Sequence, residues 1–301
     1  MPRSKFKSTD AARAAAALLA ALAWLNGCSE TSERTLEEPE KPEVTTADAE
    51  RLGKPVVYQA FTRLFGNTTT TNLPWGTIEQ NGVGKFADFT PAALTGIREL
   101  GVTHIWFTGV PHHALVGDYS AYGIDADDPD VVKGRAGSPY AVKDYYSVNP
   151  DLAVDPARRL EEFEALVARA HVQGLQVLID IVPNHVARHY RSVAKPDGVL
   201  DFGANDDTSV VWARDNNFYY VIGQDFRVPE WPEDYLPLGG EDHPAADGVF
   251  RESPARWTGN GSRSAQPQPD DWYETVKVNY GVRPDGSYDF DRLPDEARAW
   301  T

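Results

Sequence analysis

Cysteine is almost absent from this chain of 301 residues, which contains a single one, Cys28. A lone thiol excludes intramolecular disulfides and metal sites built from several cysteines. Basic residues are also scarce, since 29 Lys and Arg stand against 45 Asp and Glu and give a formal net charge of −16. Nucleic acids need a basic binding surface, so the charge balance argues against nucleic acid as a partner. It is compatible with neutral substrates, with cations or with simple solubility.

The N-terminal hydrophobic stretch falls short of transmembrane length. Residues 14–25 are apolar, follow a basic start and have the length of the central region of a signal peptide. They end in Leu25-Asn-Gly-Cys28, which resembles the lipobox of bacterial lipoproteins, where the signal is cut before a cysteine that carries a lipid. We therefore expect residues 1–28 to be a lipoprotein signal peptide and Cys28 to anchor an exported protein of a bacterial cell envelope to the membrane. The alternative is an ordinary signal peptide with an incidental thiol.

Residues 29–54 are acidic and polar and contain few apolar side chains, so we expect a disordered tether. The rest of the chain is richer in apolar residues, and 41% of the whole sequence is hydrophobic, which is enough for a sizeable core. Eight Trp and 13 Tyr are many for this length. Aromatic faces can stack on sugar rings, although most such residues lie in cores or interfaces.

From residue 56 onward, segments with the pattern of a strand alternate with segments with the pattern of a helix. Thr90 and Asp155 are expected to cap the two helices, and Gly174 to end the second. This alternation predicts an α/β fold with a parallel sheet. The elements that we expect are strands at 56–62, 102–110 and 177–182 and helices at 91–100 and 156–173.

The third of these strands carries polar residues at unusual places in the sequence VLIDIVPNHV. Its continuous apolar run predicts a strand buried on both faces, with Asp180 inside it and Pro183 at its end. Asn184 and His185 then follow the carboxyl end of the strand, where open sheets and β/α barrels place their ligands. The alternative is a strand with one satisfied polar residue, followed by a turn.

Two long connections interrupt the alternation. One covers residues 111–155 and the other residues 187–275, which are rich in Gly, Pro, Asp and Trp. A connection as long as the second is expected to fold as an inserted subdomain. We therefore divide the chain into three β/α units at 55–186, the insertion at 187–275 and a return to the first part at 276–301.

Four segments together resemble motifs of the α-amylase family, glycoside hydrolase family thirteen. Asp180-Ile-Val-Pro-Asn-His185 matches the family's third-strand motif, Asp-x-x-x-Asn-His. The stretch Gly137-Ser-Pro-Tyr-Ala-Val-Lys-Asp-Tyr145 resembles the second-loop motif, and Gly101-Val-Thr-His-Ile-Trp106 the second strand. Lys277-Val-Asn279 is similar to the motif that closes the inserted domain of neopullulanase-like members. The resemblance implies the N-terminal portion of a (β/α)8 TIM barrel with an insertion after its third strand.

The resemblance also assigns roles to residues. It implies that His185 hydrogen-bonds the sugar being cleaved, that Tyr140 stacks on the same sugar and that Asp144 holds the loop of Tyr140 in place. It further implies that Asp180 supports the charged network beside the catalytic carboxylates. Asn184 would bind a structural calcium, a cation that prefers oxygen ligands. Tyr140 could instead serve packing, and Asp144 a turn. No organic cofactor is expected.

The catalytic carboxylates themselves are not identified. A retaining glycosidase needs a nucleophile and a general acid about 5 Å apart. In the family the nucleophile lies in a Gly-x-Arg-x-Asp motif on the fourth strand, which neither Asp225-Phe-Arg-Val nor Asp289-Phe-Asp-Arg292 fits. We expect both carboxylates beyond Thr301, in an enzyme acting on α-linked glucans such as starch and maltodextrin. A non-catalytic glucan-binding lipoprotein, an inactive truncated product and a transglycosylase are the alternatives.

Overall fold

The structure is a computed structural model that describes residues 54–232 and 242–289. All of them belong to one compact unit, Leu52–Thr301. The predicted signal peptide, the lipid site at Cys28 and nearly all of the predicted tether lie outside the described residues. Within residues 54–232 and 242–289, no helix combines the length and the apolar character that crossing a membrane requires.

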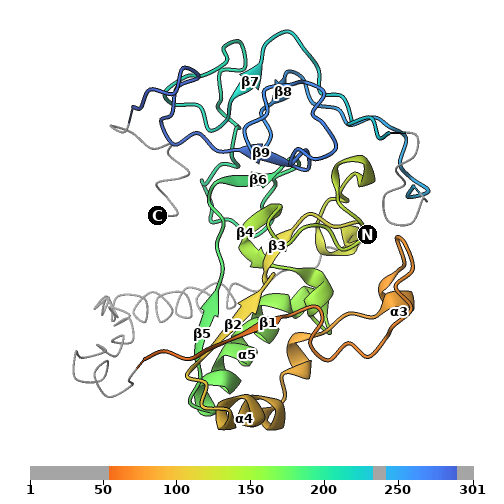
Figure 1. Cartoon of the computed structure of the whole chain (residues 1–301), viewed down its shortest axis with the longest axis vertical. Helices are drawn as coiled ribbons and strands as arrows, with labels where there is room; N and C mark the ends of the chain where they lie inside the picture. The colour runs from red at the N-terminus through yellow and green to blue at the C-terminus, as the bar shows by residue number, and fades with distance from the viewer. Residues whose placement is uncertain (1–53, 233–241, 290–301) are drawn as a thin grey trace, which may run out of the picture. The chain divides into compact units, whose positions relative to one another are not determined.

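Three parallel strands form the central sheet, as the alternating pattern predicts. They are β1 (Val57–Phe61), β2 (His104–Thr108) and β5 (Gln176–Ile179), in the order β1-β2-β5. Helix α4 (Pro91–Glu99) connects the first pair and helix α5 (Arg159–Val172) precedes the third strand. Figure 1 shows the three strands side by side with both helices close to them.

Local chemistry fixes where the helices begin and end. The Thr90 hydroxyl accepts a hydrogen bond from the Ala93 amide at 3.2 Å, and Pro91 occupies the first turn of α4. Asp155 caps a 3₁₀ turn, Pro156–Arg158, which leads into α5. Gly174 follows α5 with a φ of 74°, a left-handed conformation that other residues seldom adopt.

The main core lies between the helices and one face of the sheet. Ile105 and Phe107 of β2 are fully buried there, as are Leu94 of α4 and Leu166 of α5. Full burial of each such side chain contributes about 1.5–3 kcal/mol. The sheet and its two helices therefore form a packed unit on this side.

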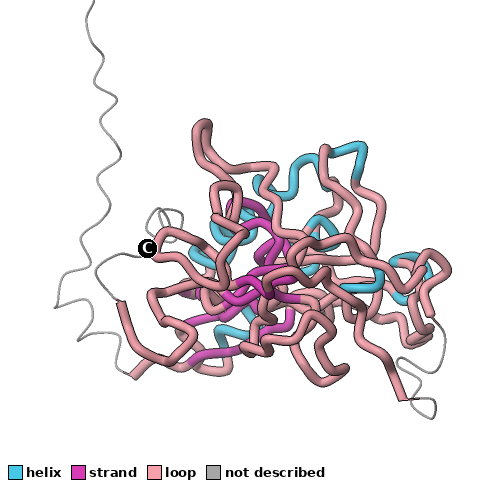
Figure 2. Tube along the Cα trace, turned by 90° about the horizontal axis from the view of Figure 1, so that it is seen from above, coloured by secondary structure: helices cyan, strands magenta, loops and turns pink. Residues whose placement is uncertain are grey.

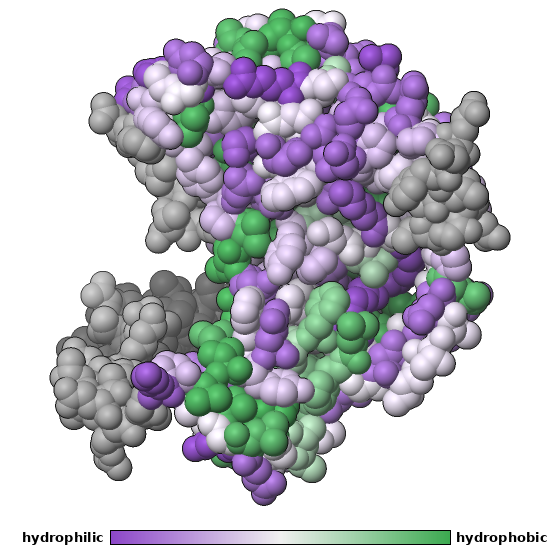
Figure 3. All heavy atoms as spheres, in the orientation of Figure 1, coloured by the Kyte–Doolittle hydropathy of each residue, from purple (hydrophilic) through white to green (hydrophobic). Residues whose placement is uncertain are grey.

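The prediction that the third strand is buried on both faces is wrong for the described residues. Leu178 and Ile179 of β5 are exposed, and Ile181 beyond it is 55% exposed. The reason is that β5 is an edge strand here, because β2 pairs with one of its sides and no described strand pairs with the other. Figure 3 shows hydrophobic side chains gathered on this part of the surface. Asp180 lies one residue past the end of β5 rather than inside the strand.

Short antiparallel sheets and irregular loops make up most of the remaining chain, as Figure 2 shows. Strand β6 (His185–Ala187) pairs with β9 (Thr275–Lys277), so the two ends of the predicted insertion lie on one sheet. Whether this segment is a separate subdomain stays a prediction. The short pairs are β3 (Pro111–His113) with β4 (Val142–Val148), β6 (His185–Ala187) with β9 (Thr275–Lys277), and β7 (Tyr220–Val221) with β8 (Ala255–Arg256).

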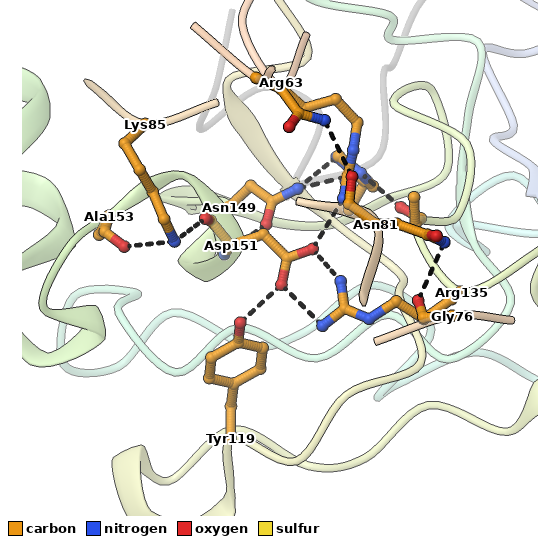
Figure 4. Close-up of polar contacts among 12 residues, drawn as sticks. Arg63, Gly76, Asn81, Lys85, Tyr119, Arg135, Asn149, Asp151 and Ala153 are labelled. Atoms are coloured by element: carbon orange, nitrogen blue, oxygen red, sulfur yellow. Dashed lines mark hydrogen bonds and ion pairs between the residues drawn. The ribbon is translucent and has the colours of Figure 1, made fainter. Parts of the chain in front are cut away.

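A fully buried carboxylate, Asp151, joins three of the loops (Figure 4). It accepts hydrogen bonds from Arg63 at 3.1 Å, from the Tyr119 hydroxyl at 2.5 Å and from Arg135. Burial alone would raise the pKa of Asp151, but the charges of Arg135 and Arg63 and the bond from Tyr119 hold it below its ordinary value. The ammonium of Lys85 donates to the Asp151 carbonyl at 2.6 Å and so ties a fourth segment to this cluster.

Candidate functional site

The structure brings Tyr140 and His185 to one cavity, although they lie far apart in the sequence. The cavity has a volume of about 420 Å³, and Trp272 also lines it. Tyr140 comes two residues before β4 and is 41% exposed, whereas His185 begins β6 and is buried. An exposed aromatic ring and a buried imidazole thus face the same space.

The hydrogen bonds of His185 fix the state of its ring. The Asn184 amide donates to Nδ1 of His185 at 3.0 Å, so this nitrogen carries no proton and the other ring nitrogen does. Burial lowers the pKa of His185, a hydrogen bond to the backbone of Tyr140 opposes the shift, and the charge of Lys277 adds to it. The indole of Trp272 lies edge-on to the imidazole, with 5.2 Å between ring centroids. The result is a neutral, oriented donor.

Asp180 lies against the side chain of Tyr140. Burial raises the pKa of the Tyr140 phenol, and so do the charge of Asp180 and the hydrogen bond between the two side chains. Oδ1 of Asp180 is buried and finds no hydrogen-bond partner among the described residues. The structure therefore joins Asp180 to the sugar-binding candidate Tyr140, while its predicted role beside catalytic carboxylates stays a prediction.

Asp144 is buried in β4 and bonds mainly to a distant segment. One of its oxygens accepts from the Ser192 hydroxyl at 2.6 Å and from the Tyr146 amide at 2.9 Å. The other accepts from the Val193 amide at 2.9 Å. The bonds from Ser192 and Val193 join β4 to the segment that follows β6, and not to the loop that carries Tyr140. Among the described residues, Asp144 therefore makes no hydrogen bond to the loop that it was predicted to hold.

The side chain of Asn184 is fully engaged by protein groups. Its oxygen accepts from the ammonium of Lys277 at 2.9 Å, and its amide donates to the Gly259 carbonyl at 2.9 Å as well as to His185. Calcium takes six to eight oxygen ligands, usually with several carboxylates. Across residues 54–232 and 242–289, no group of three or more His, Cys, Asp or Glu side chains could hold a metal ion. This donor set does not fit calcium, whose binding at Asn184 stays a prediction.

Trp272 and Glu274 are among the cavity residues that were not predicted from the sequence. Trp272 is 44% exposed, and Glu274 is buried with its carboxylate 3.1 Å from the Lys133 ammonium. Both lie shortly before Lys277 of the closing motif, and β9 pairs with β6 at His185. The one signal in the sequence was that both residues lie close to the closing motif.

The segment Gly281-Val-Arg-Pro-Asp285 was also not predicted as a site, although its letters fit the Gly-x-Arg-x-Asp motif of the family's nucleophile. The structure places this segment in a turn after β9, where the Gly286 amide donates to the Arg283 carbonyl at 2.9 Å. Asp285 is exposed and accepts from the Ser287 hydroxyl at 2.7 Å, and this bond lowers its pKa. A nucleophile at the end of a parallel strand would lie in the site, whereas Asp285 does not line the cavity.

Comparison with known proteins gives one family and several relatives. Residues 59–232, more than half of the chain, match the family described as alpha amylase, catalytic domain. Trehalose-6-phosphate hydrolase of Bacillus subtilis (strain 168) is 28% identical over 138 residues, 46% of this chain and 18% of that protein. Cyclomaltodextrin glucanotransferase of Bacillus sp. (strain 17-1) is 25% identical over 203 residues, 63% of this chain and 26% of that protein.

Among solved structures, an alpha-amylase from Lactobacillus plantarum is 31% identical to the chain, with a TM-score of 0.31. That match covers 48% of this chain and 25% of the other. The chain thus spans about a fifth to a quarter of the length of the relatives that it matches.

Proposed function

The chain belongs to the alpha-amylase family, and we propose that it is part of a retaining glycoside hydrolase that acts on α-linked glucans. The observation that carries this proposal is the convergence of Tyr140 and His185 on one cavity from two separate family motifs. The names of two relatives, a trehalose-6-phosphate hydrolase and a cyclomaltodextrin glucanotransferase, support a carbohydrate substrate. The transfer reaction named in the second makes a transglycosylase the alternative.

The cavity offers groups that suit a sugar. The exposed rings of Tyr140 and Trp272 present apolar faces on which a pyranose can stack. The neutral imidazole of His185 can donate its one N–H to a sugar hydroxyl, in exchange for its bond to the backbone of Tyr140, without adding charge. Asp180 orients the phenol of Tyr140 through their hydrogen bond. These residues would bind and position the sugar, and none of them is proposed to attack it.

The reaction would be a double displacement through a covalent glycosyl-enzyme. One carboxylate forms a bond to the anomeric carbon while a carboxylic acid protonates the departing oxygen, and water then hydrolyses the intermediate. We place both carboxylates beyond Thr301. Residues 1–301 would then bind glucan but would not cleave starch.

Binding of maltoheptaose, followed by isothermal titration calorimetry, tests the site without requiring turnover. Tyr140→Ala and His185→Ala should each weaken binding, the latter by about 1–3 kcal/mol, because a buried polar partner is lost. Tyr122→Ala is the matched control, since Tyr122 is 40% exposed and lies outside the cavity. An equal loss in Tyr122→Ala, or unchanged affinity in both cavity variants, would contradict the proposal.

We also propose that the protein is exported and anchored by a lipid on Cys28. The support is the basic and apolar start of the chain and the sequence Leu25-Asn-Gly-Cys28. Two signals usually combine for stable membrane attachment, and a multiply acylated cysteine meets that need. Calcium at Asn184 is left out of this proposal because the donor set there does not fit it.

A further inference from the structure

The contact between Asn184 and Lys277 joins two segments that lie 93 residues apart in the sequence. Lys277 is the last residue of β9 and is directly opposite His185 in the register of the β6–β9 pair. Asn184 comes one residue before β6, so the strand pairing itself brings its side chain to the ammonium. The distance of 2.9 Å is that of a charge-assisted hydrogen bond.

A third segment holds the amide of Asn184 in one orientation. The Gly259 carbonyl accepts from Nδ2 at 2.9 Å, which leaves Oδ1 to face Lys277. A Cβ at position 259 would lie 2.3 Å from Oγ1 of Thr275 and 3.0 Å from Cβ of His185. Only glycine permits this close approach, so the loop around residue 259, the start of β6 and the end of β9 meet at Asn184.

No carboxylate of the described residues forms an ion pair with the positive charge at this junction. Lys277 takes part in none of the ion pairs among the described residues, and its side chain is half-buried. Its ammonium instead bonds to a neutral amide oxygen, the kind of ligand that a hard cation selects. Within residues 54–232 and 242–289, the junction therefore contains one built-in cation and lacks the carboxylates that a divalent ion needs.

We propose that the Lys277 ammonium takes the place of a calcium ion at Asn184 and joins β6 to β9, so that this junction needs no metal. The covalently attached charge holds the same oxygen that calcium would hold, and a chelator cannot remove it. The inference rests on the contacts of Asn184 and Lys277 and is independent of the proposed glucan chemistry.

Hydrogen–deuterium exchange of the β6 and β9 amides, measured on the full chain, tests the proposal at the junction itself. In the wild type, the protection of these amides from exchange should be the same in calcium chloride and in EDTA. Lys277→Met keeps the length of the side chain but removes its charge, and should speed exchange in both strands about tenfold or more. Lys277→Arg should restore most of the protection. Lys195→Met, which removes a lysine paired with Asp201 elsewhere, should leave both strands unchanged.

Equilibrium dialysis of the wild type and of Asn184→Ala against radioactive calcium provides a second readout. The proposal predicts no calcium bound at the junction, and therefore no uptake that Asn184→Ala removes. Uptake that depends on Asn184, together with greater protection of β6 and β9 in calcium than in EDTA, would overturn it. So would unchanged exchange in Lys277→Met.

Discussion

At the scale of single residues, the candidate site unites the side chains of Tyr140 and His185, which come from two separate motifs of the chain. Tyr140, Asp180 and His185 follow from short motifs, and the structure brings all three together. The bond between Lys277 and Asn184 and the position of Trp272 could not be predicted in this way. Both depend on the antiparallel register of β6 and β9, whose sequences do not show which residues face each other.

Asp151 provides a prediction about stability. Asp151→Asn leaves the guanidinium groups of Arg63 and Arg135 without their buried counter-charge, which should lower the free energy of unfolding by about 3–5 kcal/mol. Asp197→Asn changes an exposed carboxylate and should stay within about 0.5 kcal/mol of the wild type. Urea unfolding measures both, and equal effects in the two variants would contradict the importance of the cluster.

His113 makes the stability depend on pH. Burial first, and then the charge of Arg63, lower the pKa of this imidazole from 6.5 to about 4 in the folded chain. Because the unfolded chain binds the proton more readily, the stabilising contribution is complete above pH 6.5 and is lost as the pH falls towards 4. The shift corresponds to about 3 kcal/mol.

Urea unfolding at several pH values between these limits tests the contribution of His113. His113→Gln should reduce the loss of stability on acidification, because it removes one group that must stay uncharged in the fold. His171→Gln, at an exposed position on α5, should retain the slope of the wild type. An identical slope in all three proteins would show that His113 does not titrate as described.

At the scale of elements, the sequence predicted those that depend on local chemistry. Thr90 marks the start of α4 through its side-chain hydroxyl, and Gly174 marks the end of α5 through its left-handed backbone, so both helices were found close to their true bounds. The short strands β3, β6 and β9 were not found, because a strand of three residues has no periodicity to detect. The predicted burial of β5 was wrong for another reason. An apolar run in the sequence does not show whether another strand lies beside it.

The exposed apolar side chains in and just after β5 predict that residues 1–301 self-associate. An apolar edge strand offers unpaired backbone groups and a hydrophobic surface to a second copy. Sedimentation velocity should therefore detect species larger than a monomer, and Ile179→Lys combined with Ile181→Lys should shift them towards monomer. Val172→Lys, at an exposed position of α5, is the control and should not. A wild-type chain that is monomeric at all concentrations would contradict this account.

At the scale of the whole molecule, the predicted fold class is confirmed. The match to the alpha amylase catalytic domain and the three parallel strands joined through helices agree with the N-terminal portion of a (β/α)8 barrel. The domain bounds stay predictions, because residues 54–232 and 242–289 belong to a single compact unit. Contacts between the predicted insertion and the rest of the chain, such as those of Asn184, do not follow from sequence composition.

The predicted lipid on Cys28 also concerns the whole molecule, because it determines where the protein is located. Cys28→Ala should release the protein from the membrane fraction, because the chain then lacks the thiol that carries the lipid. Immunoblots of membrane and soluble fractions measure this, and Ser29→Ala, one residue further on, should leave the protein in the membrane fraction. A wild-type protein that is already soluble would contradict the anchor.

A crystal structure of the chain with maltotriose bound tests the central claim most directly. The account predicts a glucosyl ring stacked on Tyr140 in the cavity shared with Trp272, with a sugar hydroxyl about 3 Å from the imidazole of His185. Maltotriose bound only elsewhere on the molecule, or an empty cavity at saturating sugar, would contradict it.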